Sequence, residues 1–306
     1  MGTQTLPFID FAEPDLKPGS ASWDSIRDQV RRALEEYGCF EAFFPKIPLD
    51  LRKQMFSSLE ELFDLPLQTK FKNFSEKPYH GYIGPNPLVP LYESMGIEGA
   101  NMVDNVDEFT RVMWPEGNTT FCKAIHLFSK RVSELDEMVR RMSLESIGVE
   151  KYLEEHMTST NYLLRVQKYN IVPAESNEPE PHLGIRSHTD KNVMTILYQN
   201  EVDGLEVMTK DGEWIDVHYR SPDSFIVLVG DSLHGYDEAG EEARYSLGLF
   251  TVPNGGYIIK APNELINEDH PLLFKPYDHA QFLSFYYTPQ GLSLEHALKA
   301  YCGYYK

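Results

Sequence analysis

Two short segments of the chain carry pairs of side chains that could bind a metal ion and a small acid. In RSHTDKN, His188 and Asp190 are two positions apart, and in ARYSLGLF the same spacing separates Arg244 from Ser246. Alternate residues of a β-strand point to one face, so each pair would present both side chains together if these segments are strands. The spacing therefore predicts two metal ligands in the first segment and a polar clamp in the second.

The chemistry of both pairs suits a site for iron and a dicarboxylic acid. Iron(II) with open positions is typically held by two histidines and one carboxylate on one face of an octahedron, which leaves the opposite face for cosubstrate and dioxygen. The alternative for His188 alone is a hydrogen-bonded turn histidine. Arg244 supplies a planar fork that binds a carboxylate through two hydrogen bonds, and Gly248 continues its face without bulk. The alternative for Arg244 alone is a surface arginine paired with an acid.

The elements that must position these residues change in character along the chain. The first half is predicted to hold strands at 6–11 and from Cys39, and helices from Ser22 to Gly38, from Pro48 to Pro66 and from Phe121 to Gly148. From Tyr162 onward, short β-rich runs are bounded by Gly, Pro, Asp or Asn, and no long helical pattern intervenes. This arrangement favours an antiparallel sandwich or barrel. The predicted strands are YLLRVQKYN, NVMTILYQ, GLEVMT, WIDV, SFIVLVG, RYSLGLFTV and GYIIK, followed by a short helix at 294–301.

Two further segments are predicted to be connections. The segment KPYHGYIGPNPLVPLYES is dense in Gly, Pro and aromatic residues, which is typical of a loop. Its Tyr79, His80 and Tyr82 could contact a ligand, although a packed surface loop is the favoured interpretation. The acidic stretch at 173–181 is predicted to be a solvated connection, and His182 beside it has no spacing that supports a ligand role. Other histidines are assigned to structure or surface, namely His126, His156, His218, His270, His279 and His296.

Composition narrows the class of protein. The chain has 306 residues, 28 basic and 47 acidic side chains, and a formal net charge of −19. Nucleic acids and anionic membrane surfaces would repel such a chain. Its three cysteines are widely separated, and no signal-peptide core or membrane-spanning run is found. We therefore expect a cytoplasmic protein whose partners are small molecules rather than nucleic acid or membrane.

The chain resembles the plant 2-oxoglutarate- and iron(II)-dependent dioxygenases over nearly its whole length. The motifs that carry this resemblance occur in the family's order: LPFIDF, EEYGCFEAFF, ELFDLP, RSHTDKNVMTIL, VDGLEV, WIDV, VGDSL and RYSLGLF. Within the family, the chain is most similar to the AOP-like branch, whose members act on small plant metabolites. Further segments that support this branch are DLKPGS, KPYHGY, LYESMGI and HLFSKRVSELDEMVRRM.

The resemblance implies an α+β fold with a mainly β core, namely a double-stranded β-helix (jelly roll) with N-terminal helices packed outside. It implies a helical region at 1–155, a catalytic core at 156–290 and a C-terminal helix at 291–306, all in one integrated unit. It also implies that His188 and Asp190 bind iron, that Arg244 and Ser246 bind the distal carboxylate of 2-oxoglutarate, and that Tyr169 binds its other end. We expect a monomer whose cofactors are Fe(II) and 2-oxoglutarate, supported by ascorbate.

The third iron ligand is where the sequence departs from the family. The segment VGDSLHGYDEAGEEARYS is about a dozen residues shorter than in relatives, in which a hairpin leads to the distal histidine. His234 lies ten positions before Arg244, which is the family's offset, so spacing makes it the candidate ligand. The polar residues that follow it suggest a turn, which leaves a solvent-exposed turn histidine as the alternative.

Two functions follow from these observations. The first is an oxygenase that decarboxylates 2-oxoglutarate to succinate and CO2 while it oxidises a C–H bond of a small plant metabolite, by hydroxylation or a related reaction. The alternative is a non-catalytic or truncated paralogue with a damaged iron site. Because few residues separate Asp231 from Arg244, we expect the strand before RYSLGLF to be truncated or disordered near 235–240 and catalysis to be weak or absent. The sequence does not identify the substrate.

Overall fold

The structure is a computed structural model that describes residues 5–86, 89–170, 183–209, 212–230, 234–238, 243–294 and 296–303. For residues 183, 184, 186 and 234–238 it describes the backbone only. The stretch at 173–181 and His182 lie outside the described residues, so the predictions made for them are not addressed.

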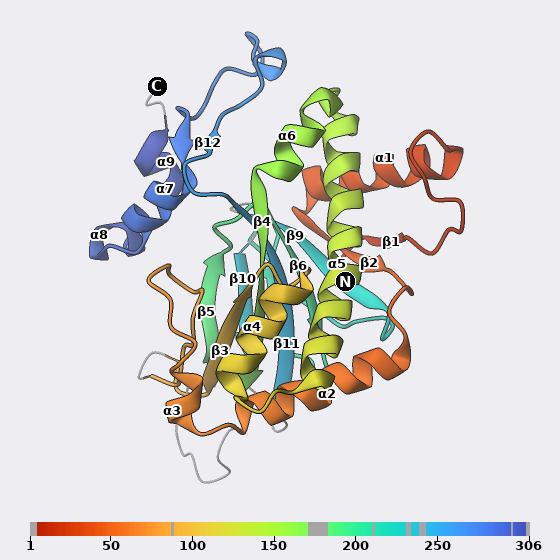
Figure 1. The fold of residues 1–306 in the computed structure, drawn as a ribbon. Helices are drawn as coiled ribbons and strands as arrows, with labels where there is room; N and C mark the ends of the chain where they lie inside the picture. The colour runs from red at the N-terminus through yellow and green to blue at the C-terminus, as the bar shows by residue number, and fades with distance from the viewer. Residues whose placement is uncertain are drawn as a thin grey trace.

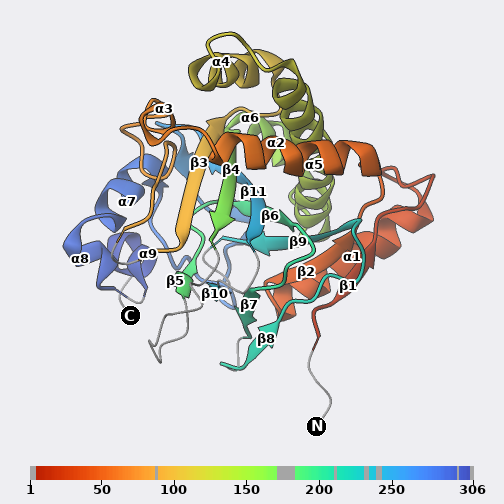
Figure 2. The same ribbon diagram turned by 90° about the horizontal axis from the view of Figure 1, so that it is seen from below.

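Two sheets face each other and form the core (Figures 1 and 2). The strands of the seven-stranded sheet are, in spatial order, β1 (Phe8–Asp10), β2 (Cys39–Phe43), β9 (Ser224–Val229), β6 (Met194–Gln199), β11 (Arg244–Pro253), β4 (Thr160–Tyr169) and β3 (Tyr92–Glu98). The strands of the four-stranded sheet are β5 (Leu183–Thr189), β10 (His234–Glu238), β7 (Leu205–Met208) and β8 (Trp214–Asp216). β12 (Ile258–Ile259) and β13 (Tyr277–Asp278) form a separate pair.

Helices cover the large sheet on the side away from the small one (Figure 2). The helices are α1 (Ala21–Glu36), α2 (Leu49–Phe63), α3 (Leu67–Lys70), α4 (Val103–Met113), α5 (Thr119–Ser146), α6 (Leu153–Thr158), α7 (His279–Tyr286), α8 (Pro289–Leu292) and α9 (Ala297–Cys302), with 3-10 turns at Glu150–Tyr152 and Asn263–Leu265. In Figure 2, α7, α8 and α9 lie beside β3 and β5, at one end of the two sheets. The predicted α+β class, with a jelly-roll core and helices outside, is confirmed.

Strand β11 shows how one sequence serves both sides of the large sheet. Tyr245, Leu247 and Leu249 belong to the apolar core shared with the helices. The alternate residues, which include Arg244 and Ser246, therefore point toward the small sheet. Polar side chains buried on this inner side need partners, which the neighbouring strands supply.

Local signals explain the helices that the sequence predicts. Ser20 caps α1, because its Oγ accepts a hydrogen bond from the backbone N of Trp23 at 3.2 Å, and Gly38 follows the helix with a φ of +75°. Asn118 caps α5 in the same way through the backbone N of Phe121 at 3.0 Å. The apolar stripes of both helices enter the core beneath the large sheet.

Several elements were not predicted. Strand β3 begins inside the segment that the sequence assigns to a loop, and α4 lies in a stretch that received no assignment. The inward positions of β3 include Ser94 and Gly96, so the strand lacks the apolar alternation that would reveal it. α4 does carry a stripe, since Val106, Phe109 and Met113 are buried along one face. α7 and α8 also precede the predicted C-terminal helix.

Candidate functional site

His188 and Asp190 lie together at the end of β5. The Nε2 atom of His188 is 3.5 Å from Oδ1 of Asp190, and the two side chains are 39% and 18% exposed. Strand β5 ends at Thr189, so both side chains sit where the strand leaves the sheet. One imidazole nitrogen and one carboxylate oxygen at this separation fit two adjacent ligands of an iron(II) ion.

The surroundings of Asp190 favour its ionised form. Burial raises the pKa of the carboxyl group, but hydrogen bonding and charge from His188 act in the opposite direction and lower the pKa overall. Thr195 adds a hydrogen bond, from its Oγ1 to Oδ2 of Asp190 at 2.5 Å. The carboxylate is the form that binds a metal, so its environment suits the role predicted for it.

The pair faces a cavity of about 50 Å³ between the two sheets. Most of the cavity wall is apolar, which limits the access of water to His188 and Asp190. The residues that line it are Gln167, Ile185, His188, Asp190, Leu197, Leu205, Val207, Leu228, Val229 and Phe250.

The backbone of His234 passes next to this pair. Residues 234–238 form β10, which pairs with β5 on one side and with β7 on the other. His234 is opposite Thr189 in the register, and Gly235 is opposite His188. The expected truncation or turn after His234 is therefore wrong over residues 234–238, because pairing on both edges satisfies the polar backbone of this short strand. The side chain of His234 lies outside the described residues.

Arg244 is held in place at the start of β11. It is 2% exposed, and its Nε and Nη2 atoms donate to Oε1 of Gln199 at 3.0 and 2.7 Å. Its Cζ lies 4.7 Å from the ring centroid of Tyr169, which is opposite it in the register of β11 and β4. These contacts fix the direction of the guanidinium group.

Ser246 links the clamp to the cavity. Its Oγ donates to Oε1 of Gln167 at 2.7 Å, and Gln167 lines the cavity beside His188 and Asp190. The structure thus brings Arg244, Ser246 and Tyr169 to the inner side of the large sheet, which agrees with the common location predicted for the clamp.

Helix α7 contacts Lys191, the residue that follows Asp190. Nε2 of the buried His279 lies 2.5 Å from the backbone O of Lys191, and the Lys191 ammonium group lies 4.9 Å from the ring centroid of Tyr286. His279, which the sequence assigns to structure or surface, has a structural position next to His188 and Asp190.

The three aromatic residues of the predicted loop have different surroundings. Tyr82 is structural, since its hydroxyl donates to the buried Glu93 at 2.9 Å. His80 Nε2 lies 3.8 Å from Glu98 at the end of β3, and its backbone lies over Gly96 on the inner side of that strand. The ring centroid of Tyr79 is 5.4 Å from the guanidinium carbon of Arg165. Tyr79 and His80 therefore both approach the inner side of the large sheet.

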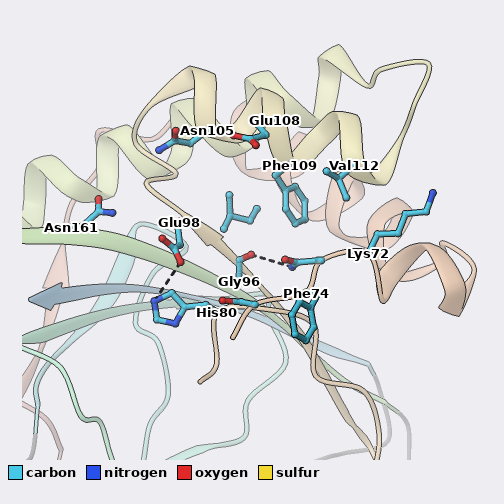
Figure 3. A pocket seen from close by; sticks show the side chains of 13 residues that line it. Lys72, Phe74, His80, Gly96, Glu98, Asn105, Glu108, Phe109, Val112 and Asn161 are labelled. Carbon is cyan, nitrogen blue, oxygen red and sulfur yellow. Dashed lines mark hydrogen bonds and ion pairs between the residues drawn. The ribbon is translucent and has the colours of Figure 1, made fainter. Parts of the chain in front are cut away.

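A wider pocket of about 400 Å³ lies outside the barrel, between α4 and the segment 72–80 (Figure 3). It shares no lining residue with the cavity of His188 and Asp190. Its histidine, His80, faces Glu98, whose carboxylate is already bound by Lys77 at 2.9 Å. Size alone therefore does not identify the site, and the smaller inner cavity is the one lined by His188 and Asp190, the residues predicted to bind iron. Within the described part of the chain, no group of three or more His, Cys, Asp or Glu side chains is placed to hold a metal ion, and the side chain of His234 is not among those described.

Sequence reasoning missed the glutamines that support the clamp. Gln199 and Gln167 come from two strands far apart in the sequence, and only the register of β6, β11 and β4 brings them together. One signal was available for β4, because Arg165, Gln167 and Tyr169 follow one another at alternate positions and so share a face.

The chain matches two family models. Residues 155–253 match the 2OG-Fe(II) oxygenase superfamily, and residues 6–88 match the N-terminal region of non-haem dioxygenases in morphine synthesis. A probable 2-oxoglutarate-dependent dioxygenase of Arabidopsis thaliana, AOP1.2, is 47% identical over 98% of this chain and 96% of its own length. The 2-oxoglutarate-dependent dioxygenase AOP2 of the same plant is 34% identical over 97% of both chains. The first alignment spans more positions than the part of this chain that it covers, so that relative has residues without a counterpart here.

Solved structures share the fold. The dioxygenase for auxin oxidation in rice has a TM-score of 0.79 at 24% identity and covers 98% of this chain and 100% of its own. JOX2, in complex with 2-oxoglutarate, Fe and JA, has a TM-score of 0.75 at 21% identity and covers 98% of this chain and 90% of its own.

Fold and site define an iron-dependent oxygenase of the jelly-roll class. The chain belongs to the 2OG-Fe(II) oxygenase superfamily, as its AOP relatives and family models show. It is an enzyme whose cofactors are Fe(II) and 2-oxoglutarate, and it uses dioxygen and a small-molecule substrate. No helix among the described residues is long and apolar enough to cross a membrane.

Proposed function

We propose that His188, Asp190 and His234 bind the iron ion of this oxygenase. The observation that carries the proposal is the 3.5 Å separation of His188 and Asp190 on the wall of an inner cavity. The position of His234 opposite Thr189 in β10 supports it as the third ligand. When bound, iron and 2-oxoglutarate supply the oxidising chemistry, in which dioxygen is consumed, 2-oxoglutarate becomes succinate and CO2, and a C–H bond of the substrate is oxidised.

Arg244, Ser246 and Tyr169 hold 2-oxoglutarate. The guanidinium of Arg244 binds the distal carboxylate, and the Ser246 hydroxyl turns from Gln167 to donate its one hydrogen bond to that carboxylate. Gln199 keeps the guanidinium fixed while the carboxylate arrives, and the ring of Tyr169 limits its movement. The apolar wall of the cavity keeps water from the reacting atoms.

The substrate is a small metabolite, and the protein acts as a cytoplasmic monomer. The negative net charge supports the absence of nucleic-acid and membrane partners. The helical region 1–155, the catalytic core 156–290 and the segment 291–306 function as one unit, since the helices before the barrel share its apolar core and His279 contacts Lys191. Ascorbate supports activity by keeping the iron reduced.

A cosubstrate assay tests this function. Purified protein is given iron(II), 2-oxoglutarate, ascorbate and dioxygen, and succinate is measured with and without a panel of small metabolites. We expect slow succinate formation that is abolished by a chelator and accelerated by a substrate. The absence of succinate under all conditions, from protein that is folded and contains iron, would overturn the proposal.

A further inference from the structure

The buried basic side chains of the described residues fall into two groups. In the first group, a carboxylate lies within ion-pair distance of each cation: Arg52 with Asp223 at 2.6 Å, Lys70 with Glu93 at 2.7 Å and Arg140 with Asp136 at 2.6 Å. The second group consists of Arg244, assigned above to 2-oxoglutarate, and Arg165. Both belong to strands of the large sheet and point to its inner side.

Arg165 is a buried cation without a matching anion. It is 3% exposed, and it forms no ion pair with any residue that the structure describes. Its Nη2 donates to Oγ of Ser94, a neutral group, while Nη1 is buried and has no hydrogen-bond partner among the described residues. Burying a charge in this way is costly unless a partner compensates it. The fork of Arg165 therefore has one arm available for a ligand.

One aromatic ring separates Arg165 from the cavity of His188 and Asp190. Its two neighbours across the sheet are glycines, Gly96 in β3 and Gly248 in β11. A side chain on Gly248 would collide with the ring of Phe250, which occupies that place and lines the cavity together with His188 and Asp190. Arg165 thus lies on one side of the Phe250 ring, and His188 and Asp190 lie on the other.

Two tyrosines stand beside this arginine. The ring of Tyr79 lies over the guanidinium group and has its centroid 5.1 Å from that of Tyr287. The phenol of Tyr287 is close enough to both Arg165 and Asp190 to interact electrostatically with each. Tyr79 holds a φ of +62°, a conformation that side chains other than glycine rarely adopt and that is found at ligand clamps.

We propose that Arg165 binds a carboxylate of the substrate, whose body packs against the rings of Tyr79 and Tyr287 and extends toward the iron site. This inference rests on the proposed function and names its substrate class, which is a small organic acid with a planar or apolar body. A forked guanidinium binds a carboxylate through two hydrogen bonds, and flat rings hold an apolar body at little entropic cost. Since the chain carries a net charge of −19, a local cation is needed to attract an anion into it.

Matched acids and amides test the substrate class. Benzoate, phenylacetate and 3-phenylpropanoate are each titrated by calorimetry against their neutral amides, which have nearly the same shape. Titrations are done anaerobically, on the protein with iron(II) and 2-oxoglutarate and on the metal-free protein. We expect the wild type to bind at least one acid ten times or more tighter than its amide. Equal affinity for acid and amide in all three pairs, or binding of none, would overturn the inference.

Variants then assign the preference to Arg165. Arg165→Gln should weaken binding of the acid at least tenfold and leave the amide and 2-oxoglutarate unaffected, and Arg165→Lys should lie between. Lys168→Gln removes a charge from the opposite face of the same strand and should change nothing, while Tyr79→Leu should weaken acid and amide alike. An acid preference that persists in a folded Arg165→Gln protein contradicts the inference; if that variant does not fold, an unaltered preference in Arg165→Lys contradicts it.

The same titrations separate this inference from the proposed function. A protein that binds neither iron nor 2-oxoglutarate but still selects acids through Arg165 would refute the function and retain the inference. A protein that binds both cofactors normally and has no Arg165-dependent selectivity would refute only the inference.

Discussion

His188 and Asp190 line the inner cavity at the end of β5, so we expect their replacement to affect metal binding more than folding. We predict that His188→Ala or Asp190→Ala weakens metal affinity beyond the roughly 10- to 100-fold that loss of an outer hydrogen-bond partner costs, since each removes a direct ligand. The thermal midpoint of the metal-free protein should stay within a few degrees. Metal titration by calorimetry, with circular dichroism as the folding control, measures both quantities. Full metal affinity in His188→Ala would place the site elsewhere.

Arg244 is predicted to supply most of the affinity for 2-oxoglutarate. Arg244→Ala should cost on the order of 2–5 kcal/mol of binding free energy, as for truncation of one partner of a buried hydrogen-bonded charge pair. Arg244→Lys should be partly impaired, because a point charge cannot replace a fork. Ser246→Ala should cost about 1 kcal/mol, the typical contribution of one hydrogen bond. Fluorescence or calorimetry measures the affinity for 2-oxoglutarate in each variant. Normal affinity in Arg244→Ala would contradict the assignment.

At this scale, the sequence predicts pairs within one strand and misses partners between strands. His188 with Asp190, and Arg244 with Ser246, can be found because alternation places positions i and i+2 on one face. Gln199 and the unpaired arm of Arg165 cannot, since both depend on which residues lie opposite one another in strands distant in sequence. The side chains that define a substrate pocket are set by such register, and the pattern within a strand does not contain it.

At the scale of elements, a buried network attaches α5 to the barrel. Asp136 of α5 binds Arg140 at 2.6 Å and accepts hydrogen bonds from Tyr162 of β4 at 2.8 Å and Thr251 of β11 at 2.7 Å. Asp136→Ala should lower the free energy of unfolding by about 3–5 kcal/mol, because it leaves the buried Arg140 without its partner. Urea denaturation of the metal-free protein measures the change.

The matched control for this network is an exposed pair on the same helix. Glu134 binds Arg131 at 2.8 Å, with the two side chains 36% and 49% exposed. Glu134→Ala should cost no more than about 1 kcal/mol, as is usual for surface ion pairs. Equal effects of the two substitutions would show that the network does not anchor the helix.

His156, at the end of the helical region, is predicted to make the fold sensitive to acid. Burial, reinforced by the charge of Arg140, lowers the pKa of His156 to about 4. The unfolded chain binds a proton at this histidine near pH 6.5, so the stability from the neutral form is complete above that pH and is lost as pH falls toward 4. The free energy of unfolding of His156→Gln should therefore fall by up to about 3 kcal/mol less than that of the wild type when the pH is lowered. Denaturation curves of the wild type and of His156→Gln at pH 7 and pH 4.5 measure this difference in the free energy of unfolding. An identical pH dependence in the two proteins would show that His156 is not the source of the acid sensitivity.

Elements with a strong repeating pattern were predicted, and those without one were not. The helices α1, α2 and α5 follow from their apolar stripes and from the Gly or Pro that ends each pattern, and the strands after Tyr162 follow from short β-rich runs. Strand β10 was missed because its sequence, HGYDE, is polar and contains glycine, and it depends on neighbours on both edges. Pairing across a sheet can hold a strand whose own residues favour a turn.

For the whole molecule, the open question is whether the shortened segment leaves a complete iron site. The strand order β5-β10-β7-β8 supplies a continuous second sheet, with the backbone of His234 beside the His188 and Asp190 strand. This arrangement removes the reason for expecting weak catalysis, because the strand that carries His234 is present over residues 234–238. We accordingly predict a working metal centre and not a remnant.

The most direct measurement is an anaerobic titration of the purified wild type and of His234→Ala with iron(II) in the presence of 2-oxoglutarate. The wild type should bind one iron ion per chain, and His234→Ala should bind it at least about 100-fold more weakly, beyond the effect of losing an outer partner. His126→Ala, on α5, serves as the control and should bind iron like the wild type. Substoichiometric iron in the wild type, or unaltered affinity in His234→Ala, would contradict the site proposed for this chain.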